Sequence, residues 1–377
     1  MRRVLYVHAS ADRYGSDQSL LRLVTSLGES YEPVVVLAVD GPLVEALRSH
    51  GVETHVLPLA VLRRRGRLAP TAAAWVAAMP AMIRLLRERR PSLVHSNSLA
   101  VTEGACAARL LGVPHVWHVR ELVPRPLMFR VVLATLALLT SRRVIAISRP
   151  VADWFAGRGR LRQRTVVIHN GREYGTAAAR AARAATVEEP LTIALIARLT
   201  TWKGHNLVMQ AVAQLAPSLR DRVRVVFAGD VFPGKEDVEI GLRKEASALG
   251  VADRVEFLGY VASSAVLEKC DAVVVASETP EPFGNVMLEA MDVGLPVIAT
   301  AQGGPLDVVV DGETGLLVAP EPQAIAGAIA RFVEDQELRA RLGRAGYARA
   351  RRRFTQERTT GKVLALYDDL LRPEGER

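Results

Sequence analysis

Residues 277–318, SETPEPFGNVMLEAMDVGLPVIATAQGGPLDVVVDGETGLLV, decide the fold. The apolar run 272–276 leads into this stretch and is typical of a buried parallel strand. Residues 285–293 have helical periodicity, and 296–300 have the composition of a second strand. This order predicts a βαβ unit, and ligands of open parallel sheets bind at the carboxyl ends of the strands.

The first strand is followed by a turn that carries polar groups. Glu281 begins the turn, which continues through Phe283 and Gly284 to a helix that starts at Asn285. Glu289 lies one turn further along that helix. A Pro-Phe-Gly turn before an amphipathic helix also occurs in many α/β domains without a functional role.

The second strand is followed by two glycines, Gly303 and Gly304. Residues without a Cβ allow backbone N–H groups to approach a ligand closely. Amide donors suit phosphate and carboxylates suit hydroxyl groups, so the two turns together suit a nucleotide sugar.

The combination of these features at this spacing resembles the signature of retaining nucleotide-sugar glycosyltransferases of family four, which have the GT-B architecture. The resemblance implies two Rossmann-like, doubly wound α/β domains facing one another across a cleft. In that family the first Glu of a Glu-seven-residue-Glu motif binds a sugar hydroxyl and the second binds the ribose. These roles pass to Glu281 and Glu289. We expect donor contacts from the residues between and after them: Phe283, Gly284, Asn285, Gly303 and Gly304.

Length and composition fit this expectation. A chain of 377 residues, 49% of them hydrophobic, is long for one domain, so two are expected. Cys106 and Cys270 lie far apart and no CxxC pair occurs, which favours a reducing cytoplasm. The first residues contain no apolar leader, so no signal peptide is expected. The longest apolar stretch, at 131–140, is too short to span a bilayer.

The charge is unevenly distributed. Residues 1–170 carry 24 Arg, no Lys and 11 acidic residues, a formal charge of +13; residues 171–377 carry 25 basic and 29 acidic residues, a charge of −4. This excess favours an anionic partner or surface for the first half. Nucleic acid is not expected, because aromatic residues make up only 5% and no nucleic-acid motif occurs.

The pattern of apolar runs predicts a first domain over 1–170, a linker or exposed helix over 171–190 and a second domain over 191–354. As in GT-B relatives, a last helix over 355–371 is expected to cross back onto the first domain. Further strands are expected at 3–8, 33–39, 54–57, 92–95, 115–119, 143–147, 166–168, 191–197, 223–229 and 255–259.

The strand at 191–197 is followed by two cations, Arg198 and Lys203, with Gly204 at the start of a helix. Two cations and a helix N-terminus can neutralise a diphosphate leaving group. An Arg followed five residues later by Lys-Gly also resembles the diphosphate clamp of the family. The alternative is a positively charged helix cap.

Two sites are expected in the first domain. The turn at Gly15-Ser16 resembles the loop that approaches the donor diphosphate and the acceptor in the family, although it is also compatible with an ordinary turn. His118 lies in a segment that resembles the family's loop after this strand, where a His contacts the transferred sugar. The adjacent Arg120 and Glu121 could pair with each other.

A lipid surface is a further candidate partner. The cations Arg63, Arg64, Arg65 and Arg67 precede an Ala-rich segment with Trp75, Met79, Met82 and Ile83, and then Arg84, Arg87, Arg89 and Arg90. A cationic cluster beside an apolar helix suits an anionic membrane surface. A solvated loop and a core helix would give the same pattern. The apolar helix at 126–141 is expected to pack on the sheet or to touch lipid.

These observations predict an enzyme. The expected reaction is transfer of a hexose from a UDP- or GDP-sugar to a carbohydrate or lipid-linked acceptor, in cell-surface polysaccharide or glycolipid synthesis. No Asp-x-Asp occurs, and Arg198 and Lys203 supply cations, so neither metal nor cofactor is expected. The expected location is cytoplasmic, with peripheral contact to the inner face of the membrane. A small-glycoside transferase, a sugar-nucleotide epimerase of the same architecture and a binding protein remain alternatives.

Overall fold

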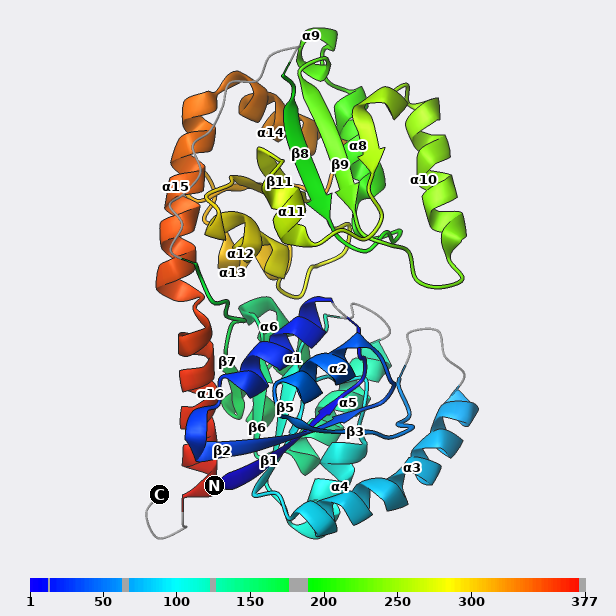
Figure 1. Cartoon of the computed structure of the whole chain (residues 1–377), viewed down its shortest axis with the longest axis vertical. Helices are drawn as coiled ribbons and strands as arrows, with labels where there is room; N and C mark the ends of the chain where they lie inside the picture. Colours follow the sequence, from blue (N-terminus) through cyan, green and yellow to red (C-terminus); the bar gives the residue numbers. More distant parts are fainter. Residues whose placement is uncertain (13, 63–67, 123–126, 176–188, 373–377) are drawn as a thin grey trace. The chain divides into compact units, whose positions relative to one another are not determined.

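The computed structural model describes residues 1–12, 14–62, 68–122, 127–175 and 189–372, and only the backbone of 68–71. These residues form two compact units, shown in Figure 1. Unit 1 comprises Met1–Glu173 and Thr355–Arg377, and unit 2 comprises Tyr174–Phe354. Each unit has its own sheet and its own buried core.

Unit 1 is built on a parallel sheet that, within the described residues, has seven strands in the order β3-β2-β1-β4-β5-β6-β7. The strands are β1 (Arg2–His8), β2 (Tyr31–Leu37), β3 (Glu53–Val56), β4 (Leu93–Ser96), β5 (His115–Val119), β6 (Arg143–Ala146) and β7 (Thr165–Val167). The chain moves outward from β1 in one direction and returns to start β4 on its other side. The topological switch point, where α/β sheets bind ligands, therefore lies between β1 and β4.

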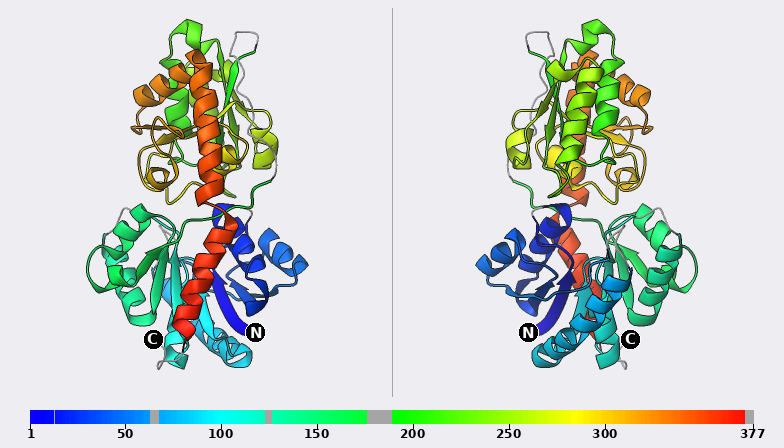
Figure 2. Two further views of the ribbon diagram at one scale, coloured as in Figure 1. Left: turned by 90° about the vertical axis from the view of Figure 1, so that its left-hand side faces the viewer. Right: turned by 90° about the vertical axis from the view of Figure 1, so that its right-hand side faces the viewer.

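Helices cover both faces of this sheet because alternate side chains of a strand point to opposite faces. Tyr6 of β1 packs with the face that carries α1 (Gly15–Thr25), α2 (Pro42–Ser49) and α16 (Gln356–Leu371). Leu5 packs with the face that carries α3 (Leu68–Arg89) and α4 (Glu103–Leu111). Figure 2 shows α16 running along the sheet. The remaining helices of unit 1 are η1 (Gly28–Ser30), α5 (Leu127–Thr140), α6 (Arg149–Ala156) and α7 (Arg160–Gln163).

Unit 2 contains a second parallel sheet, with six strands among the described residues in the order β10-β9-β8-β11-β12-β13. They are β8 (Leu191–Ile196), β9 (Val223–Ala228), β10 (Val255–Phe257), β11 (Ala272–Val275), β12 (Val297–Thr300) and β13 (Leu316–Val318). The strand order reverses between β8 and β11, which places the switch point of this unit there.

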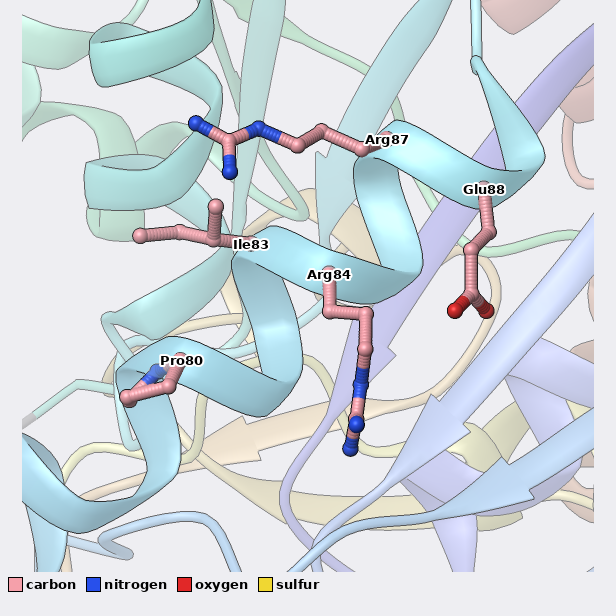
Figure 3. A pocket seen from close by; sticks show the side chains of 5 residues that line it. All are labelled: Pro80, Ile83, Arg84, Arg87 and Glu88. Atoms are coloured by element: carbon pink, nitrogen blue, oxygen red, sulfur yellow. The ribbon is translucent and has the colours of Figure 1, made fainter.

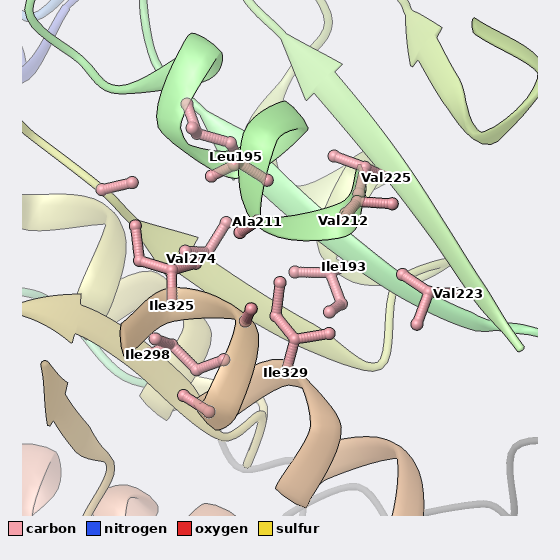
Figure 4. Packing of buried hydrophobic residues seen from close by; sticks show 14 of the residues in the cluster. Ile193, Leu195, Ala211, Val212, Val223, Val225, Val274, Ile298, Ile325 and Ile329 are labelled. Carbon is pink, nitrogen blue, oxygen red and sulfur yellow. The ribbon is translucent and has the colours of Figure 1, made fainter. Parts of the chain in front are cut away.

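The core of unit 2 joins strands of this sheet to the helices beside it. Ile193, Val274 and Ile298 of three neighbouring strands meet Ile325 and Ile329 of α14, as Figure 4 shows. The helices of this unit are α8 (His205–Ala213), α9 (Pro217–Arg220), α10 (Glu236–Ala248), η2 (Ala252–Arg254), α11 (Ser263–Leu267), α12 (Asn285–Asp292), α13 (Pro305–Val308), α14 (Pro322–Glu334) and α15 (Gln336–Arg353).

The predicted α/β class with two doubly wound sheets is confirmed. Each strand expected from the sequence lies within two residues of its observed bounds. Among the strands of the described residues, β13 was not expected; it has three residues and lies at the edge of its sheet.

Helix α3 corrects the predicted membrane-facing helix. Met79 and Met82 are buried in the core of unit 1. The indole N–H of Trp75 donates to the Thr102 hydroxyl at 2.9 Å, and Arg89 pairs with Glu53. Trp75, Met79 and Met82 therefore face the protein, whereas Arg84 and Arg87 are exposed and their contact with a membrane stays a prediction. The cluster Arg63 to Arg67 lies outside the described residues, as does most of the predicted linker.

Helix α5 packs on unit 1 with only part of its surface. Leu133 and Ala137 are buried, whereas four residues of its first two turns are between 51% and 75% exposed: Leu127, Met128, Val131 and Val132. Among the described residues, no helix has both the length and the apolar character needed to cross a bilayer.

Candidate functional site

The carboxyl ends of β8 and β11 bring the predicted cation and carboxylate of unit 2 together. Lys203 follows β8 and Glu281 follows β11, and these strands are neighbours at the switch point. The ammonium Nζ of Lys203 donates to Oε2 of Glu281 at 2.5 Å. The hydroxyl of Ser277 donates to the same oxygen at 2.9 Å. Glu281 is 8% exposed. Its carboxylate is therefore largely buried, and its partners are an ammonium group and a hydroxyl group.

Aromatic rings flank both cations. Lys203 Nζ lies 4.4 Å from the centroid of the Trp202 ring, and the guanidinium carbon of Arg198 lies 4.1 Å from that of Phe232. Phe232 follows β9, the strand next to β8. Cation–π contacts hold long basic side chains in place without neutralising them. Both cations thus lie on the loop that follows β8, each beside an aromatic ring.

Gly204 lets the loop that carries Lys203 pass close to β11. Its φ is +78°, and a Cβ there would lie 1.8 Å from the carbonyl oxygen of Ala276. Helix α8 begins at the next residue, His205, which is fully buried. Burial, assisted by the charge of Lys203, lowers the pKa of His205 to about 3, so this imidazole is neutral at pH 7.

Gly303 and Gly304 fit the loop after β12 against the turn at Glu281. A Cβ on Gly303 would lie 2.2 Å from the Glu281 carbonyl oxygen, and a Cβ on Gly304 would lie 2.3 Å from Cα of Phe283. The N–H of Gly304 donates to the Glu281 carbonyl at 2.6 Å. This amide was expected to face the donor. Its N–H instead bonds the loop after β12 to the turn at Glu281.

The turn from Phe283 to Asn285 positions α12. The Phe283 ring is buried and meets Phe354 edge to face, with centroids 6.1 Å apart. The ring therefore belongs to the core, and the donor contact expected of Phe283 stays a prediction. Gly284 has a φ of +86° and precedes Asn285, the first residue of α12. Asn285 and Glu289 are spaced four apart, so they share one half-buried face of this helix.

A buried polar network occupies the switch point of unit 1. Asp17 of α1 accepts hydrogen bonds from the Ser10 hydroxyl at 2.6 Å and pairs with Nε2 of His8 at 3.2 Å. Burial alone would raise the pKa of Asp17. The hydrogen bond and charge of His8, together with the hydrogen bond from Ser10, outweigh burial and lower this pKa below its usual value. Gly15 and Ser16 form the start of the same helix.

Arg120 lies just beyond β5 and is 8% exposed. Its guanidinium donates to the side-chain oxygens of Asn97 and Asn170, both at 2.8 Å. Glu121 instead accepts from the Ser98 hydroxyl and from the backbone N–H groups of Leu99 and Arg120. The suggested side-chain pair of Arg120 with Glu121 is therefore not formed.

His118 is buried near the end of β5. Its Nδ1 lies 3.2 Å from Nε2 of His95. Its Nε2 has no hydrogen-bond partner within the described part of the chain. Burial lowers the pKa of His118 well below its usual value, and the charge of Arg120 adds to this. This neutral imidazole thus has one buried ring nitrogen without a hydrogen-bond partner in the described residues.

Two family models match the chain. One, described as a glycosyl transferase 4-like domain, matches residues 15–171, and the other, glycosyl transferases group 1, matches residues 179–349. The chain belongs to the group 1 glycosyltransferase family. Together the two models cover both units, and the architecture is GT-B.

Relatives of this group 1 family member include two curated proteins. A D-inositol 3-phosphate glycosyltransferase of Stackebrandtia nassauensis is 35% identical over 191 residues, which cover 49% of this chain and 43% of that protein. The lipopolysaccharide core biosynthesis glycosyltransferase LpsE of Rhizobium meliloti is 35% identical over 170 residues, which cover 45% of this chain and 47% of that protein. The chain spans less than half the length of each.

A solved structure matches nearly all of this chain. The crystal structure of Anabaena HepE in complex with UDP-glucose matches with a TM-score of 0.83 at 26% identity, over 98% of this chain and 100% of that one. The fold of this chain is therefore that of a relative solved with UDP-glucose, over 98% of this chain.

No role in the site was predicted from the sequence for five polar residues: His8, Asp17, Asn97 and Asn170 in unit 1 and Ser277 in unit 2. The polar residues that directly follow β4 and β11 were the available signal, because such positions lie at the ligand-binding edge of a parallel sheet.

A surface hollow of about 600 Å³ lies elsewhere in unit 1 and is lined by Pro80, Ile83, Arg84, Arg87 and Glu88. All five residues come from α3, and Figure 3 shows Arg84 and Arg87 pointing in different directions. The hollow contains none of the candidate residues at the ends of the strands, so we do not assign it to the donor.

Proposed function

We propose that this protein transfers a sugar from a nucleoside diphosphate sugar to an acceptor hydroxyl with retention of configuration. The observation that carries the proposal is the contact of Lys203 with Glu281 at the switch point of unit 2, with Arg198 on the same loop. The structures of Anabaena HepE with UDP, UDP and glucose, and UDP-glucose support a nucleotide sugar as the donor.

The two cations would act on the leaving group. As the bond between the anomeric carbon and the diphosphate oxygen breaks, negative charge grows on the diphosphate. Arg198 beside Phe232, and Lys203 once it has turned from Glu281, would stabilise that charge, since charged groups held by the protein lower the barrier more than mobile water does. The cations come from the chain itself, so we propose that transfer needs no metal ion. Turnover that persists in EDTA would support this.

The carboxylates would bind the neutral parts of the donor. Glu281 would accept a hydrogen bond from a sugar hydroxyl, and Glu289 would accept one from the ribose, as the family resemblance implies. When Lys203 turns toward a diphosphate, Glu281 keeps the Ser277 hydroxyl as a partner. The oxygen released by Lys203 can then accept a hydrogen bond from the sugar. His118 would contact the transferred sugar through its unpartnered nitrogen.

The remaining proton needs no protein base. The acceptor oxygen would form its bond to the anomeric carbon on the face from which the diphosphate leaves. An oxygen of that diphosphate would take the acceptor proton, so the products are the glycoside and the protonated nucleoside diphosphate.

Replacement of the paired residues tests the proposal. Lys203→Ala and Glu281→Ala should each lower turnover by on the order of a hundredfold, the usual loss when a group that stabilises transition-state charge is removed. Lys235→Ala, on the exposed surface of the same unit, is the matched control. Near-normal turnover in either site variant would rule out this mechanism.

Donor identity is tested by thermal shift with UDP-, GDP-, ADP- and dTDP-sugars. A ligand that binds only the native state raises the melting temperature. A product assay without acceptor separates transfer from epimerisation, because an epimerase would then yield a new nucleotide sugar.

We propose further that the acceptor is lipid-linked or anionic and that unit 1 contacts an anionic membrane surface. The charge of +13 over residues 1–170 supports this proposal. The contact would run through α5, whose exposed side chains Leu127, Met128, Val131 and Val132 form an apolar surface. Such an acceptor fits synthesis of cell-surface polysaccharide or glycolipid.

A further inference from the structure

Arg120 is a buried cation of unit 1 that the proposed mechanism does not use. Its side chain is 8% exposed. Its Nε–H donates to the amide oxygen of Asn97, and its Nη1 donates to that of Asn170, both at 2.8 Å. Asn97 and Arg120 directly follow β4 and β5, and Asn170 lies shortly beyond β7. The guanidinium therefore lies at the carboxyl edge of the sheet, where α/β domains bind ligands.

The side chain of Arg120 keeps its positive charge. Burial lowers its pKa to about 10, and the charge of Glu121 acts in the opposite direction, so the group is a cation at neutral pH. Within the described residues it forms no ion pair, because its two side-chain partners are neutral amides. The carboxylates whose charges favour this cation, Glu121 and Asp17, bond hydroxyl, imidazole and backbone N–H groups instead.

The guanidinium has hydrogen-bond donors left over. Nη2 carries two of its five N–H groups. No described residue accepts a hydrogen bond from this nitrogen, since the two bonds of the side chain start from Nε and Nη1. The enclosed polar side-chain atoms that lack a partner within the described residues do not include Nη2, so this nitrogen has accessible surface. Its two N–H groups can therefore meet a ligand.

A second polar atom with unused capacity lies near this cation. His118 precedes Arg120 by two residues, and burial together with the charge of Arg120 lowers the pKa of His118. The Nε2 of His118 is enclosed and has no hydrogen-bond partner among the described residues. Because buried polar atoms of native proteins have partners as a rule, two such groups at one edge of a sheet indicate a binding place.

A structural tie alone does not account for the charge of Arg120. A neutral donor could join two amide oxygens at a smaller cost, because burying a cation without a counter-charge is far less favourable than burying a neutral group. An oxyanion that bonds Nη2 would supply the counter-charge. Arginine is also the side chain best suited to phosphate and carboxylate groups.

We propose that Arg120 binds an anionic group of the acceptor, a phosphate or a carboxylate, through the N–H groups of Nη2. Asn97 and Asn170 hold the guanidinium at Nε and Nη1, so they are positioning residues for this contact. The assignment to the acceptor rests on the proposed function, in which the donor diphosphate already has Arg198 and Lys203 as its cations.

The test is nitrogen-15 NMR of the arginine side chains in the full chain, with inorganic phosphate and acetate as probes. The signals of Arg120 are assigned by their loss in Arg120→Lys. At least one of the two anions should shift them, whereas chloride at the same ionic strength should not. Arg109→Gln, at an exposed position of α4, is the matched control and should leave this response unchanged. Signals of Arg120 that neither anion moves, or that chloride moves equally, overturn the proposal.

Two further arms identify the source of the anion. UDP, at a concentration that saturates its thermal shift, should leave the Arg120 signals in place. Signals that move with UDP would assign the anion to the donor and overturn the proposal. Arg120→Gln should sediment with anionic vesicles as the wild type does. Loss of sedimentation would assign this cation to the membrane surface and would also overturn the proposal.

Turnover separates this proposal from the proposed function. Arg120→Gln should raise the KM for the acceptor by roughly ten- to a hundredfold, the usual range for a lost hydrogen bond to a charged group. Its thermal shift with UDP should equal that of the wild type, which shows that the variant is folded. Transfer with an unchanged acceptor KM refutes the role of Arg120 and leaves the proposed function intact. An anion response of Arg120 without transfer from any donor refutes the proposed function and leaves the anion site intact. The titration of the wild type decides even where Arg120→Gln does not fold.

Discussion

At the scale of single residues, the pair Lys203–Glu281 combines a functional role with a structural one. Both side chains are mostly buried, at 19% and 10% exposure. Removing one partner of such a pair leaves the other charge desolvated without compensation, which costs more than the pair itself contributes. Loss of activity in a single variant therefore has two causes, lost chemistry and lost stability.

The double variant separates these causes. Lys203→Ala should lower the free energy of unfolding by about 1–3 kcal/mol, because Glu281 keeps only its Ser277 partner. Lys203→Ala/Glu281→Ala should recover part of that stability, yet should remain as inactive as the single variants. Thermal melts and turnover measured on the same samples check this. A double variant less stable than Lys203→Ala would contradict an unpaired carboxylate as the cause.

A second prediction at this scale concerns pH. His115 is buried between the hydroxyls of Ser141 and Ser96, at 2.8 and 2.9 Å. Burial lowers its pKa to about 3, against about 6.5 in an unfolded chain. Between these values the unfolded state binds the proton and the folded state does not, so stability rises with pH and is lost as the pH falls through this window.

The measurement is the melting temperature between about pH 4 and pH 7. His115→Gln keeps an amide for the two serines and should flatten the dependence in this window. Part of the dependence of the melting temperature on pH should remain in this variant, because His205 also has a pKa of about 3. His50→Gln at an exposed position is the control and should leave the slope unchanged.

The residue types of the site were predictable from sequence, but their partners were not. Lys203 and Glu281 were each expected to bind the donor, and their direct contact joins residues 78 apart. Arg120 was expected near Glu121, whereas its guanidinium bonds Asn97 and Asn170, which lie 23 and 50 residues away. Partners at such distances depend on strand order, which one sequence does not specify.

At the scale of elements, buried strands were predictable and helix faces were not. Parallel strands buried on both faces appear as continuous apolar runs, such as Val273 to Val275 in β11. The Ala-rich helix α3 gave no clear face, and its Trp and Met residues were assigned to lipid although they face the core. Helix α5 instead has four exposed apolar residues in its first two turns.

The loops between elements depend on glycines at close contacts. Gly204→Ala should destabilise unit 2 by at least about 2 kcal/mol, since φ is +78° and the new Cβ would lie 1.8 Å from the Ala276 carbonyl oxygen. The change should also weaken donor binding, because the loop carries Lys203. Gly327→Ala, within α14 and with nothing near its Cβ, should stabilise the chain slightly. Thermal melts with and without UDP compare the two; equal melting temperatures would show that the loop yields at little cost.

At the scale of the whole molecule, the charge is concentrated in the first half. Unit 1 takes in most of the arginine excess, whereas residues 171–377 carry a charge of −4. The proposed donor site takes its two cations, Arg198 and Lys203, from unit 2. The arginine excess of unit 1 is therefore not needed for the diphosphate, and we propose that it meets an anionic surface.

Sedimentation with vesicles tests that use of the charge. Binding to anionic vesicles should fall steeply between 0.1 and 1 M salt, because the screening length drops from about 10 Å to about 3 Å. Apolar insertion by α5 should add a part that salt does not remove.

Variants of α5 isolate the apolar part. Leu127→Ser, Met128→Ser, Val131→Ser and Val132→Ser together should abolish the binding that survives high salt and leave the salt-sensitive part intact. Val76→Ser/Leu110→Ser changes exposed apolar residues of α3 and α4 and is the matched control. Equal loss in both sets would mean that α5 has no special role, and equal binding to zwitterionic vesicles would mean that the arginine excess serves another partner.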